Sequence, residues 1–181
     1  MAANWILLHA VPETGKHFIL EDQNIWLDPI REFGLSCTVL DPMRAEFTVF
    51  LQEDGVFIRG KVTGRVAVPC TRCMEAAVVL VDQHVDSYEL FPVEDGTDED
   101  RLGVDEELLR PAQNGSGVEM NLAALAWEEF SLALPMKPLC DMACKGLCTQ
   151  CGANRNTAPC ACEMDTSDPR LALLRNLKVD R

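Results

Sequence analysis

Six of the chain's nine cysteines are crowded into one short stretch, residues 138–162. They are Cys140, Cys144, Cys148, Cys151, Cys160 and Cys162. The residues between them are mostly small or polar and include Gly146 and Gly152, so the stretch cannot bury a hydrophobic core of its own. Thiolate–metal bonds are the obvious means of offsetting the entropy lost on ordering it. The stretch therefore predicts a metal-held tail, with one or two zinc ions.

The spacing of the cysteines indicates which of them form knuckles. Cys148 and Cys151 are followed by Gly152, as in a C-x-x-C-G knuckle whose glycine takes the left-handed turn position. A second C-x-x-C pair, Cys70 and Cys73, lies between two β-branched runs, where the tip of a hairpin would fall. At a turn, this spacing favours metal ligation or dithiol chemistry over two unrelated thiols.

The spacings allow two arrangements of the ligands. In one, Cys160 and Cys162 complete a local site with the Cys148 knuckle. In the other, the Cys70 knuckle meets the Cys148 knuckle as in a zinc ribbon and ties the tail to the sheet. Without Cys37, the chain has enough cysteines for two four-sulfur sites or for one site with spare thiols. The candidate ligands are Cys70, Cys73, Cys140, Cys144, Cys148, Cys151, Cys160 and Cys162.

Two other cysteine chemistries compete with zinc. Cys144, Cys148 and Cys151 have the C-x3-C-x2-C spacing of iron–sulfur enzymes that cleave S-adenosylmethionine, but those enzymes need a large barrel and only 30 residues follow Cys151. Dithiol redox exchange at a C-x-x-C pair lacks the βαβ context of thioredoxin-like proteins. The histidines are scattered, and the sequence has neither a nucleophile elbow nor a glycine-rich phosphate loop. We therefore expect a non-enzyme with no catalytic residues and no small-molecule substrate.

The formal net charge of −13 is unevenly distributed along the chain. Residues 137–181 hold seven Lys/Arg and five Asp/Glu, a formal +2, which leaves −15 on residues 1–136. An acidic body repels a phosphate backbone, so RNA contacts should be confined to the tail or pass through a protein partner. Many cysteines, a start unlike a signal peptide and no apolar run that could span a bilayer predict a cytoplasmic protein without a membrane partner.

The hydrophobic pattern predicts an α+β fold. Apolar and polar residues alternate from 45 to 52, and a turn and further β-branched runs follow, so an antiparallel sheet is expected over about residues 44–90. An apolar stripe after Asn121, a good N-cap residue, predicts a packed helix over about residues 121–133. A proline interrupts the pattern at residues 24–34, which predicts a turn or one or two helical turns.

Two further segments complete the expected organisation. The acidic run at about residues 92–107 has the composition of a solvated loop. Asp168, followed by proline, is typical of a helix start and predicts a short final helix. We therefore expect an acidic α+β domain at residues 1–136 and a cysteine-rich tail at residues 137–181 that ends in a helix.

A series of motifs along the chain points to a known family. In order, these are Cys70-Thr-Arg-Cys-Met-Glu, Asn121-Leu, Leu134-Pro, Pro138-Leu-Cys140, Cys144-Lys-Gly-Leu-Cys148, Cys151-Gly-Ala-Asn154 with Asn156, Cys160-x-Cys162 and Asp168-Pro-Arg-Leu. Over about residues 40–178 the series resembles the bacterial YceD family, the large ribosomal RNA subunit accumulation proteins. The string that begins at Cys144 is its most specific part. The resemblance implies a role in the synthesis, processing or stability of 23S rRNA, with no catalytic residues assigned.

Four residues near the Cys148 knuckle are candidates for partner binding. Lys145 and Arg155 are cations in the only net-basic part of the chain, and Asn154 and Asn156 could add amide hydrogen bonds. The alternative is that these residues only cap the metal loop. The expected partner is a basic ribosomal protein or a pre-ribosomal particle, or rRNA through the basic tail.

Overall fold

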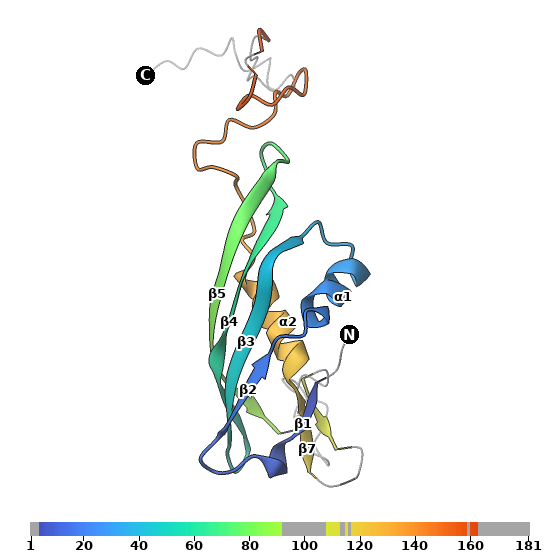
Figure 1. The fold of residues 1–181 in the computed structure, drawn as a ribbon, viewed down its shortest axis with the longest axis vertical. Coiled ribbons are helices and arrows are strands. Elements are labelled where there is room, and N and C mark those ends of the chain that lie inside the picture. Colours follow the sequence, from blue (N-terminus) through green and yellow to red (C-terminus); the bar gives the residue numbers. More distant parts are fainter. Residues whose placement is uncertain (1–3, 92–107, 113–114, 116, 159, 163–181) are drawn as a thin grey trace, which may run out of the picture.

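The computed structural model describes residues 4–91, 108–112, 115, 117–158 and 160–162. Its main element is an antiparallel sheet of four strands in the order β2-β3-β4-β5 (Figure 1). These strands are β2 (Lys16–Leu20), β3 (Thr38–Leu51), β4 (Gly55–Pro69) and β5 (Ala76–Leu90). The fold is therefore α+β, as predicted, and the sheet contains the expected span from residue 44 to residue 90.

A second, smaller sheet joins the two ends of the described domain. Its strands are β1 (Trp5–Leu7), β6 (Leu109–Pro111) and β7 (Val118–Asn121), in the order β1-β7-β6. A 3-10 turn, η1 (Leu8–Ala10), follows β1 directly. The sequence analysis predicted neither β6 nor β7, which are only three and four residues long.

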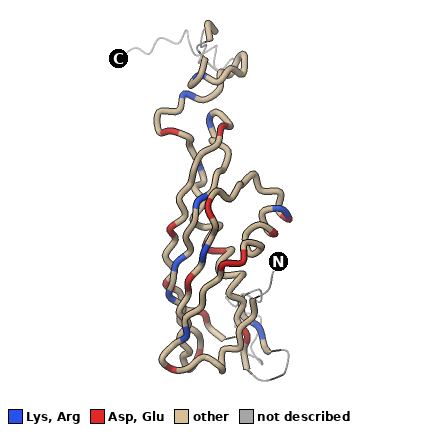
Figure 2. Tube along the Cα trace, in the orientation of Figure 1, with Lys and Arg blue, Asp and Glu red and all other residues tan. Residues whose placement is uncertain are grey.

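The long strands alternate between a buried face and a face with charged pairs. Phe47 on β3 and Ile58 and Val62 on β4 are fully buried on the side that α2 (Leu122–Ala133) covers. Residues of the opposite parity include Arg59, which pairs with Asp86 on the neighbouring strand. Charged residues of both signs are spread along the sheet (Figure 2). This pattern is that of an antiparallel sheet with one face on the core and one in water.

Helix α2 begins where the sequence predicts it. The Asn121 side-chain oxygen accepts hydrogen bonds from the backbone N–H groups of Ala123 at 3.2 Å and Ala124 at 3.3 Å. Phe130 is buried against the sheet, and its ring lies 5.5 Å from that of Trp127. No helix in the described ranges is both long enough and apolar enough to cross a membrane.

Removing the cap of α2 should cost a measurable part of the stability. We expect Asn121→Ala to lower the free energy of unfolding by about 1 kcal/mol, because two N-terminal N–H groups lose their acceptor. Asn121→Ser retains a capping oxygen and should stay close to wild type. Urea denaturation followed by circular dichroism measures both variants, and equal losses for alanine and serine would show that the cap adds nothing.

Helix α1 (Asn24–Glu32) is longer than predicted, because Pro29 lies inside it rather than ending it. Proline in a helix interior removes one backbone hydrogen bond and normally costs about 3 kcal/mol. Here Trp26 and Ile30 are buried in the core, and this packing outweighs the local preference. Burial of these side chains has therefore outweighed the tendency of Pro29 to end the helix.

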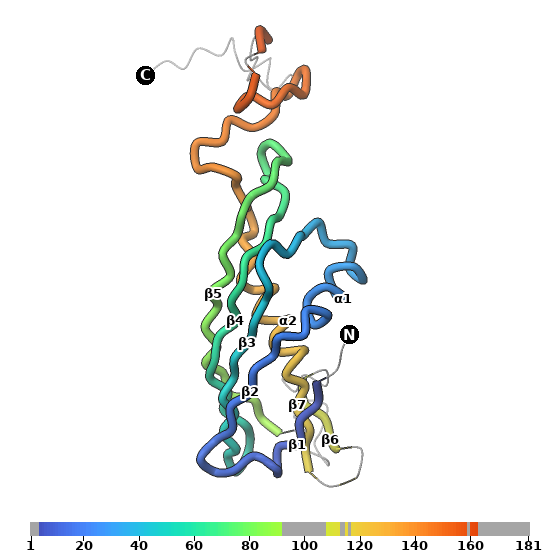
Figure 3. The backbone as a smooth tube through the Cα atoms, viewed as in Figure 1, coloured from blue at the N-terminus to red at the C-terminus, as the bar shows by residue number. Residues whose placement is uncertain are grey.

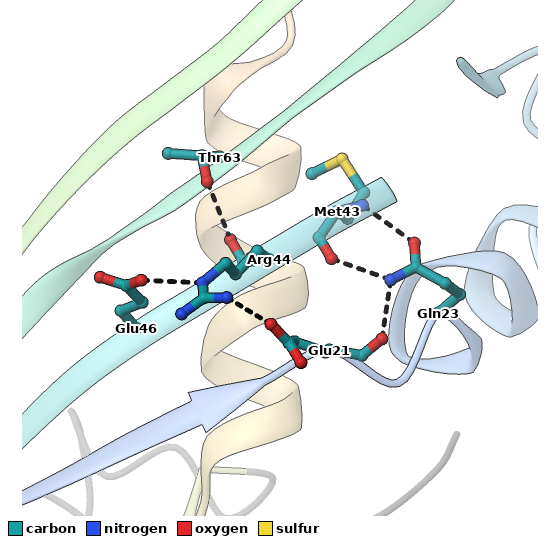
Figure 4. A network of polar contacts seen from close by, with 6 residues as sticks. All are labelled: Glu21, Gln23, Met43, Arg44, Glu46 and Thr63. Atoms are coloured by element: carbon teal, nitrogen blue, oxygen red, sulfur yellow. Dashed lines mark hydrogen bonds and ion pairs between the residues drawn. The ribbon is translucent and has the colours of Figure 1, made fainter. Parts of the chain in front are cut away.

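Gln23 connects the start of α1 to an irregular part of β3 (Figure 4). Met43 has no partner in the β3–β4 register, and the Gln23 amide takes the place of one: it donates to the Met43 carbonyl at 2.8 Å and accepts from the Met43 N–H at 2.9 Å. The next residue, Arg44, pairs with Glu46 at 2.8 Å and with Glu21. The Gln23 side chain thus supplies the hydrogen bonds that the backbone of β3 lacks where its pairing with β4 is interrupted.

The cysteine-rich stretch lies at one end of the long sheet. The β4–β5 hairpin projects beyond the helices, and the chain leaving α2 runs back to the tip of this hairpin before it folds into the cysteine-rich loops (Figures 1 and 3). The predicted acidic loop at residues 92–107 and the predicted final helix lie outside the described residues.

Candidate metal centres

The tip of the β4–β5 hairpin is a cysteine knuckle, as the C-x-x-C spacing predicts. Cys70 follows β4 and Cys73 lies three residues before β5, and both are buried. The turn is held by hydrogen bonds from the Met74 N–H to the Cys70 carbonyl at 2.9 Å and from the Cys70 N–H to the Glu75 carbonyl at 2.8 Å. Met74 takes the left-handed conformation that closes the turn, with φ 64°.

The segment that follows α2 brings two more cysteines to this knuckle. The Thr71 N–H donates to the Pro138 carbonyl at 2.9 Å, and Arg72 Nη1 donates to the Cys144 carbonyl at 2.8 Å. Leu139 packs against the buried cysteines of the hairpin tip. The four sulfurs of Cys70, Cys73, Cys140 and Cys144 all lie within 4.8 Å of one another, and we call this group cluster 1.

A second group forms from cysteines that are close in sequence. The sulfurs of Cys148, Cys151, Cys160 and Cys162 also lie within 4.8 Å of one another, and we call this group cluster 2. Its first knuckle is closed by a hydrogen bond from the Gly152 N–H to the Cys148 carbonyl at 2.9 Å. Gly152 has φ +72°, the left-handed position that the C-x-x-C-G pattern predicts.

The structure selects one of the two arrangements that the spacings allow. Cluster 2 is closed locally by its own four cysteines. The zinc-ribbon arrangement, in which the Cys70 knuckle meets the Cys148 knuckle, is not formed. Cys140 and Cys144 instead complete the hairpin knuckle, because the chain after α2 returns to the hairpin tip before it reaches Cys148. Cys37 belongs to neither group.

The sulfur spacing of cluster 1 suits a single tetrahedral ion. The Cys70 and Cys144 sulfurs are 3.8 Å apart, and those of Cys73 and Cys140 are 3.4 Å apart. Four sulfurs bound at about 2.3 Å to one Zn²⁺ ion would be separated by about 3.8 Å. A disulfide requires about 2.05 Å, and all nine cysteines are free thiols. Both clusters could therefore hold a metal ion with sulfur ligands alone.

In each cluster, the surroundings lower the pKa of at least one cysteine thiol. Burial raises the pKa of Cys70, but hydrogen bonds from the backbone N–H groups of Cys140 and Arg72 outweigh it and lower the pKa to about 6. In cluster 2, backbone N–H groups, that of Cys151 foremost, lower the pKa of Cys148 to about 6. At neutral pH each cluster thus offers at least one anionic sulfur to an arriving cation.

The remaining sulfurs include two that hold their protons firmly. The hydrogen bond with Cys73 raises the pKa of Cys140 to about 12, and the hydrogen bond with Cys151 raises that of Cys162 to about 12. Several thiolates crowded together repel one another, so a proton is retained in place of a second or third negative charge. A divalent cation removes that repulsion, and its binding releases these protons.

The two asparagines singled out in the sequence take part in the scaffold. Asn156 Nδ2 donates to the Cys144 sulfur at 3.3 Å, and Asn154 Nδ2 donates to Glu75 at 3.4 Å. Lys145 is exposed, whereas Arg155 is half-buried and its backbone N–H donates to the Gly146 carbonyl at 3.0 Å. The capping role that the sequence left open thus has direct support for both asparagines. A role in recognition stays a prediction for the two cations.

Sequence reasoning missed two residues that shape cluster 1. Arg72, the second residue between the knuckle cysteines, reaches the Cys144 carbonyl, and its own carbonyl accepts from the Leu147 N–H at 2.9 Å. Gly146 has φ +73°, and a Cβ at this position would lie 2.9 Å from the Arg72 carbonyl oxygen. The glycine between Cys144 and Cys148 was the signal for this close approach.

The fold and the two clusters define a class: an antiparallel-sheet domain whose longest hairpin carries two four-cysteine groups at its tip. The family model of the large ribosomal RNA subunit accumulation protein YceD matches residues 58–178, which include every cysteine of both clusters. The chain therefore belongs to the YceD family, as its motifs indicate. The family's name concerns the accumulation of large-subunit ribosomal RNA.

One curated relative gives a shorter match. The Arabidopsis thaliana protein described as large ribosomal RNA subunit accumulation protein YCED homolog 1, chloroplastic, is 40% identical over 47 residues. The match covers 26% of this chain and 15% of that protein, so the chain spans a small part of the relative's length. No solved structure matches the chain significantly.

Proposed function

We propose that this protein is a non-catalytic cytoplasmic factor that supports the accumulation of 23S rRNA during ribosome biogenesis, with two structural zinc ions at the tip of its hairpin. The observation that carries the proposal is the match to the YceD family over residues 58–178, which spans the clusters and the hairpin that holds them. A reducing cytosol keeps cysteines available as metal ligands.

The geometry of the clusters favours zinc over an iron–sulfur centre. The sulfur–sulfur distances of 3.4 and 3.8 Å in cluster 1 suit four ligands on one ion. A [4Fe–4S] centre binds each cysteine to a different iron and a [2Fe–2S] centre binds two cysteines to each iron, so in both the sulfurs on different irons would lie further apart. Four-cysteine sites are typical of structural zinc, because protein ligands take all four positions of the tetrahedral ion.

The charges near the clusters favour a protein partner over bare RNA. Among the described residues around the hairpin tip, four cations face two carboxylates: Arg72, Lys137, Lys145 and Arg155 against Glu75 and Asp141. Two Zn²⁺ ions held by eight thiolates would add four negative charges, so the loaded tip would be net negative. A basic ribosomal protein, free or within a pre-ribosomal particle, fits this charge and that of the acidic body.

Exposed methionines around the clusters also suit a protein partner. Met74, Met136 and Met142 are 65%, 97% and 88% exposed. Methionine side chains are flexible and polarizable, and surfaces that bind other proteins use them often. Apolar contacts of this kind would supply affinity that the net charge does not, and they need no contact with phosphate.

Two experiments test the proposal. Deleting the gene should lower the amount of large-subunit rRNA relative to small-subunit rRNA, and the wild-type chain should restore it. Affinity capture from lysate with and without RNase separates a protein partner, which survives RNase, from an rRNA contact, which does not. Normal subunits in the deletion strain, together with the loss of a redox activity, would favour the rival iron–sulfur or dithiol function instead.

The role of the two cations can be tested by charge reversal. If the two cations contact acidic groups of the partner directly, Lys145→Glu with Arg155→Glu should weaken capture roughly tenfold, whereas capture that depends on the net negative charge of the tip should not be weakened. Metal content should stay near wild type, because neither residue belongs to either cysteine cluster. Lys16→Glu, which reverses one charge on β2, is the matched control for each of the single variants Lys145→Glu and Arg155→Glu. Unchanged capture would show that the two cations take no part in recognition.

A further inference from the structure

Asn156 belongs to the loop of one cluster but contacts a ligand of the other. It lies between Cys151 and Cys160, within the loop that cluster 2 closes. Its Nδ2 group donates to the sulfur of Cys144, a member of cluster 1, at 3.3 Å. Hydrogen bonds to ligand sulfurs orient them and stabilise their thiolate form. Cluster 2 therefore supplies a supporting interaction to cluster 1.

The remaining hydrogen bonds of this amide determine its orientation. Asn156 Oδ1 accepts from the Lys145 N–H at 2.7 Å, so this atom is the oxygen and the Nδ2 group must face the sulfur. The second Nδ2 hydrogen is used by Asn154 Oδ1 at 2.9 Å. The side chain is thus held in place by three partners: the Cys144 sulfur, the Lys145 N–H and the Asn154 side-chain oxygen.

The backbones of the two loops are also joined. Leu147 and Asn154 form an antiparallel bridge, and the Arg155 N–H donates to the Gly146 carbonyl at 3.0 Å. Residues 145–148, which connect the clusters, therefore pair with the part of the cluster 2 loop that precedes Asn156. Without metal in cluster 2, these hydrogen bonds join short loops that are rich in small and polar residues, and we expect them alone to order Asn156 only weakly.

We propose that Asn156 couples the two metal centres, so that metal at either cluster raises the affinity of the other. The inference rests on the metal binding assigned in the proposed function. Closing cluster 2 places the amide against Cys144, which strengthens cluster 1. By thermodynamic linkage, a loaded cluster 1 strengthens cluster 2 by the same factor. Asn156 is a positioning residue here, since it binds no metal itself.

The test is a zinc titration of the full chain, reduced and metal-free, in competition with a chromophoric chelator. Four proteins form a cycle: wild type, Asn156→Ala, Cys151→Ser/Cys162→Ser to disable cluster 2, and the combination. In the wild-type background, disabling cluster 2 should weaken zinc binding at cluster 1 by about 10- to 100-fold. In the Asn156→Ala background it should make little further difference. Thr149→Ala, at an exposed position of the Cys148 knuckle, should behave as wild type.

Each outcome of the cycle has a definite meaning. Equal weakening of cluster 1 in both backgrounds would show that the coupling does not pass through Asn156. Unchanged affinity at cluster 1 when cluster 2 is disabled, with two zinc ions taken up independently by the wild type, would refute the coupling but leave the metal sites intact. No zinc uptake by the wild type would overturn both the coupling and the metal assignment in the proposed function.

Discussion

Replacing Cys144 with serine is expected to remove the metal of cluster 1 and to release the tail from the hairpin tip. Cys144 is buried, its sulfur lies 3.8 Å from that of Cys70, and it accepts the Asn156 hydrogen bond. A serine hydroxyl is not ionised at neutral pH and is a poor replacement for a thiolate. Because a structural zinc site contributes on the order of 10 kcal/mol, this is the largest effect we expect from a single substitution.

Zinc content and thermal unfolding measure the Cys144→Ser variant. It should hold at most one zinc ion per chain and should melt at a lower temperature than wild type. Cys37→Ser is the matched control, because Cys37 is half-buried and belongs to neither cluster. This variant should keep the full metal content. If Cys144→Ser retained as much zinc as Cys37→Ser, cluster 1 would not be a metal site.

Truncating Phe130 is expected to destabilise the domain without changing its metal content. Phe130 is fully buried on α2, so Phe130→Ala removes contacts with the sheet and with Trp127 and leaves a cavity. The expected loss is about 3–5 kcal/mol in the free energy of unfolding. Chemical denaturation followed by far-UV circular dichroism measures it. Zinc content below the melting transition should equal that of wild type, because the clusters lie at the hairpin tip, which projects beyond α2 (Figure 1).

A control for Phe130→Ala lies two residues along the same helix. Leu132 is 67% exposed, so Leu132→Ala should change the free energy of unfolding by no more than about 0.5 kcal/mol. Equal losses from the two substitutions would mean that the effect comes from helix propensity and not from packing. A drop in zinc content with Phe130→Ala would show that the core and the clusters are not separate sources of stability.

The parts of the fold that were predicted correctly have strong local signals. The β3–β4 hairpin combines strict alternation with a turn sequence, and both strands bury the expected residues. Asn121 was read as an N-cap from the apolar stripe that follows it, and its side chain does accept from two N–H groups of α2. The knuckle at Cys70 was expected at a hairpin tip because β-branched runs flank it. In each case the structure is determined by residues that are close together in the sequence.

The parts that could not be predicted depend on tertiary contacts. Whether α1 continues through Pro29 is decided by the burial of Trp26, which the local pattern does not reveal. The pairing of Cys70 with Cys144 depends on where the chain goes after α2, and these residues are 74 positions apart. The small sheet pairs β1 with β7, strands from the two ends of the described domain and too short for a clear pattern.

In the candidate site, too, the ligands could be predicted from the sequence, whereas the residues that support them could not. All eight predicted ligands are in the two clusters, because cysteine spacing is a specific signal. The supporting contacts are not visible in spacing. Asn156 was interpreted as a partner-binding residue or as a cap of the metal loop, and only the folded loop shows that it lies 3.3 Å from the Cys144 sulfur. The sequence analysis assigned no role to Arg72, whose guanidinium donates to the Cys144 carbonyl at 2.8 Å.

The central claim is that each four-sulfur cluster holds one zinc ion. The most direct test is elemental analysis of the full chain, purified without oxygen or added metal, combined with an assay for acid-labile sulfide. The account predicts two zinc ions per chain, one for each cluster, with no sulfide. A brown protein that contains iron and acid-labile sulfide would contradict the account, and so would a reduced, folded protein that contains no metal.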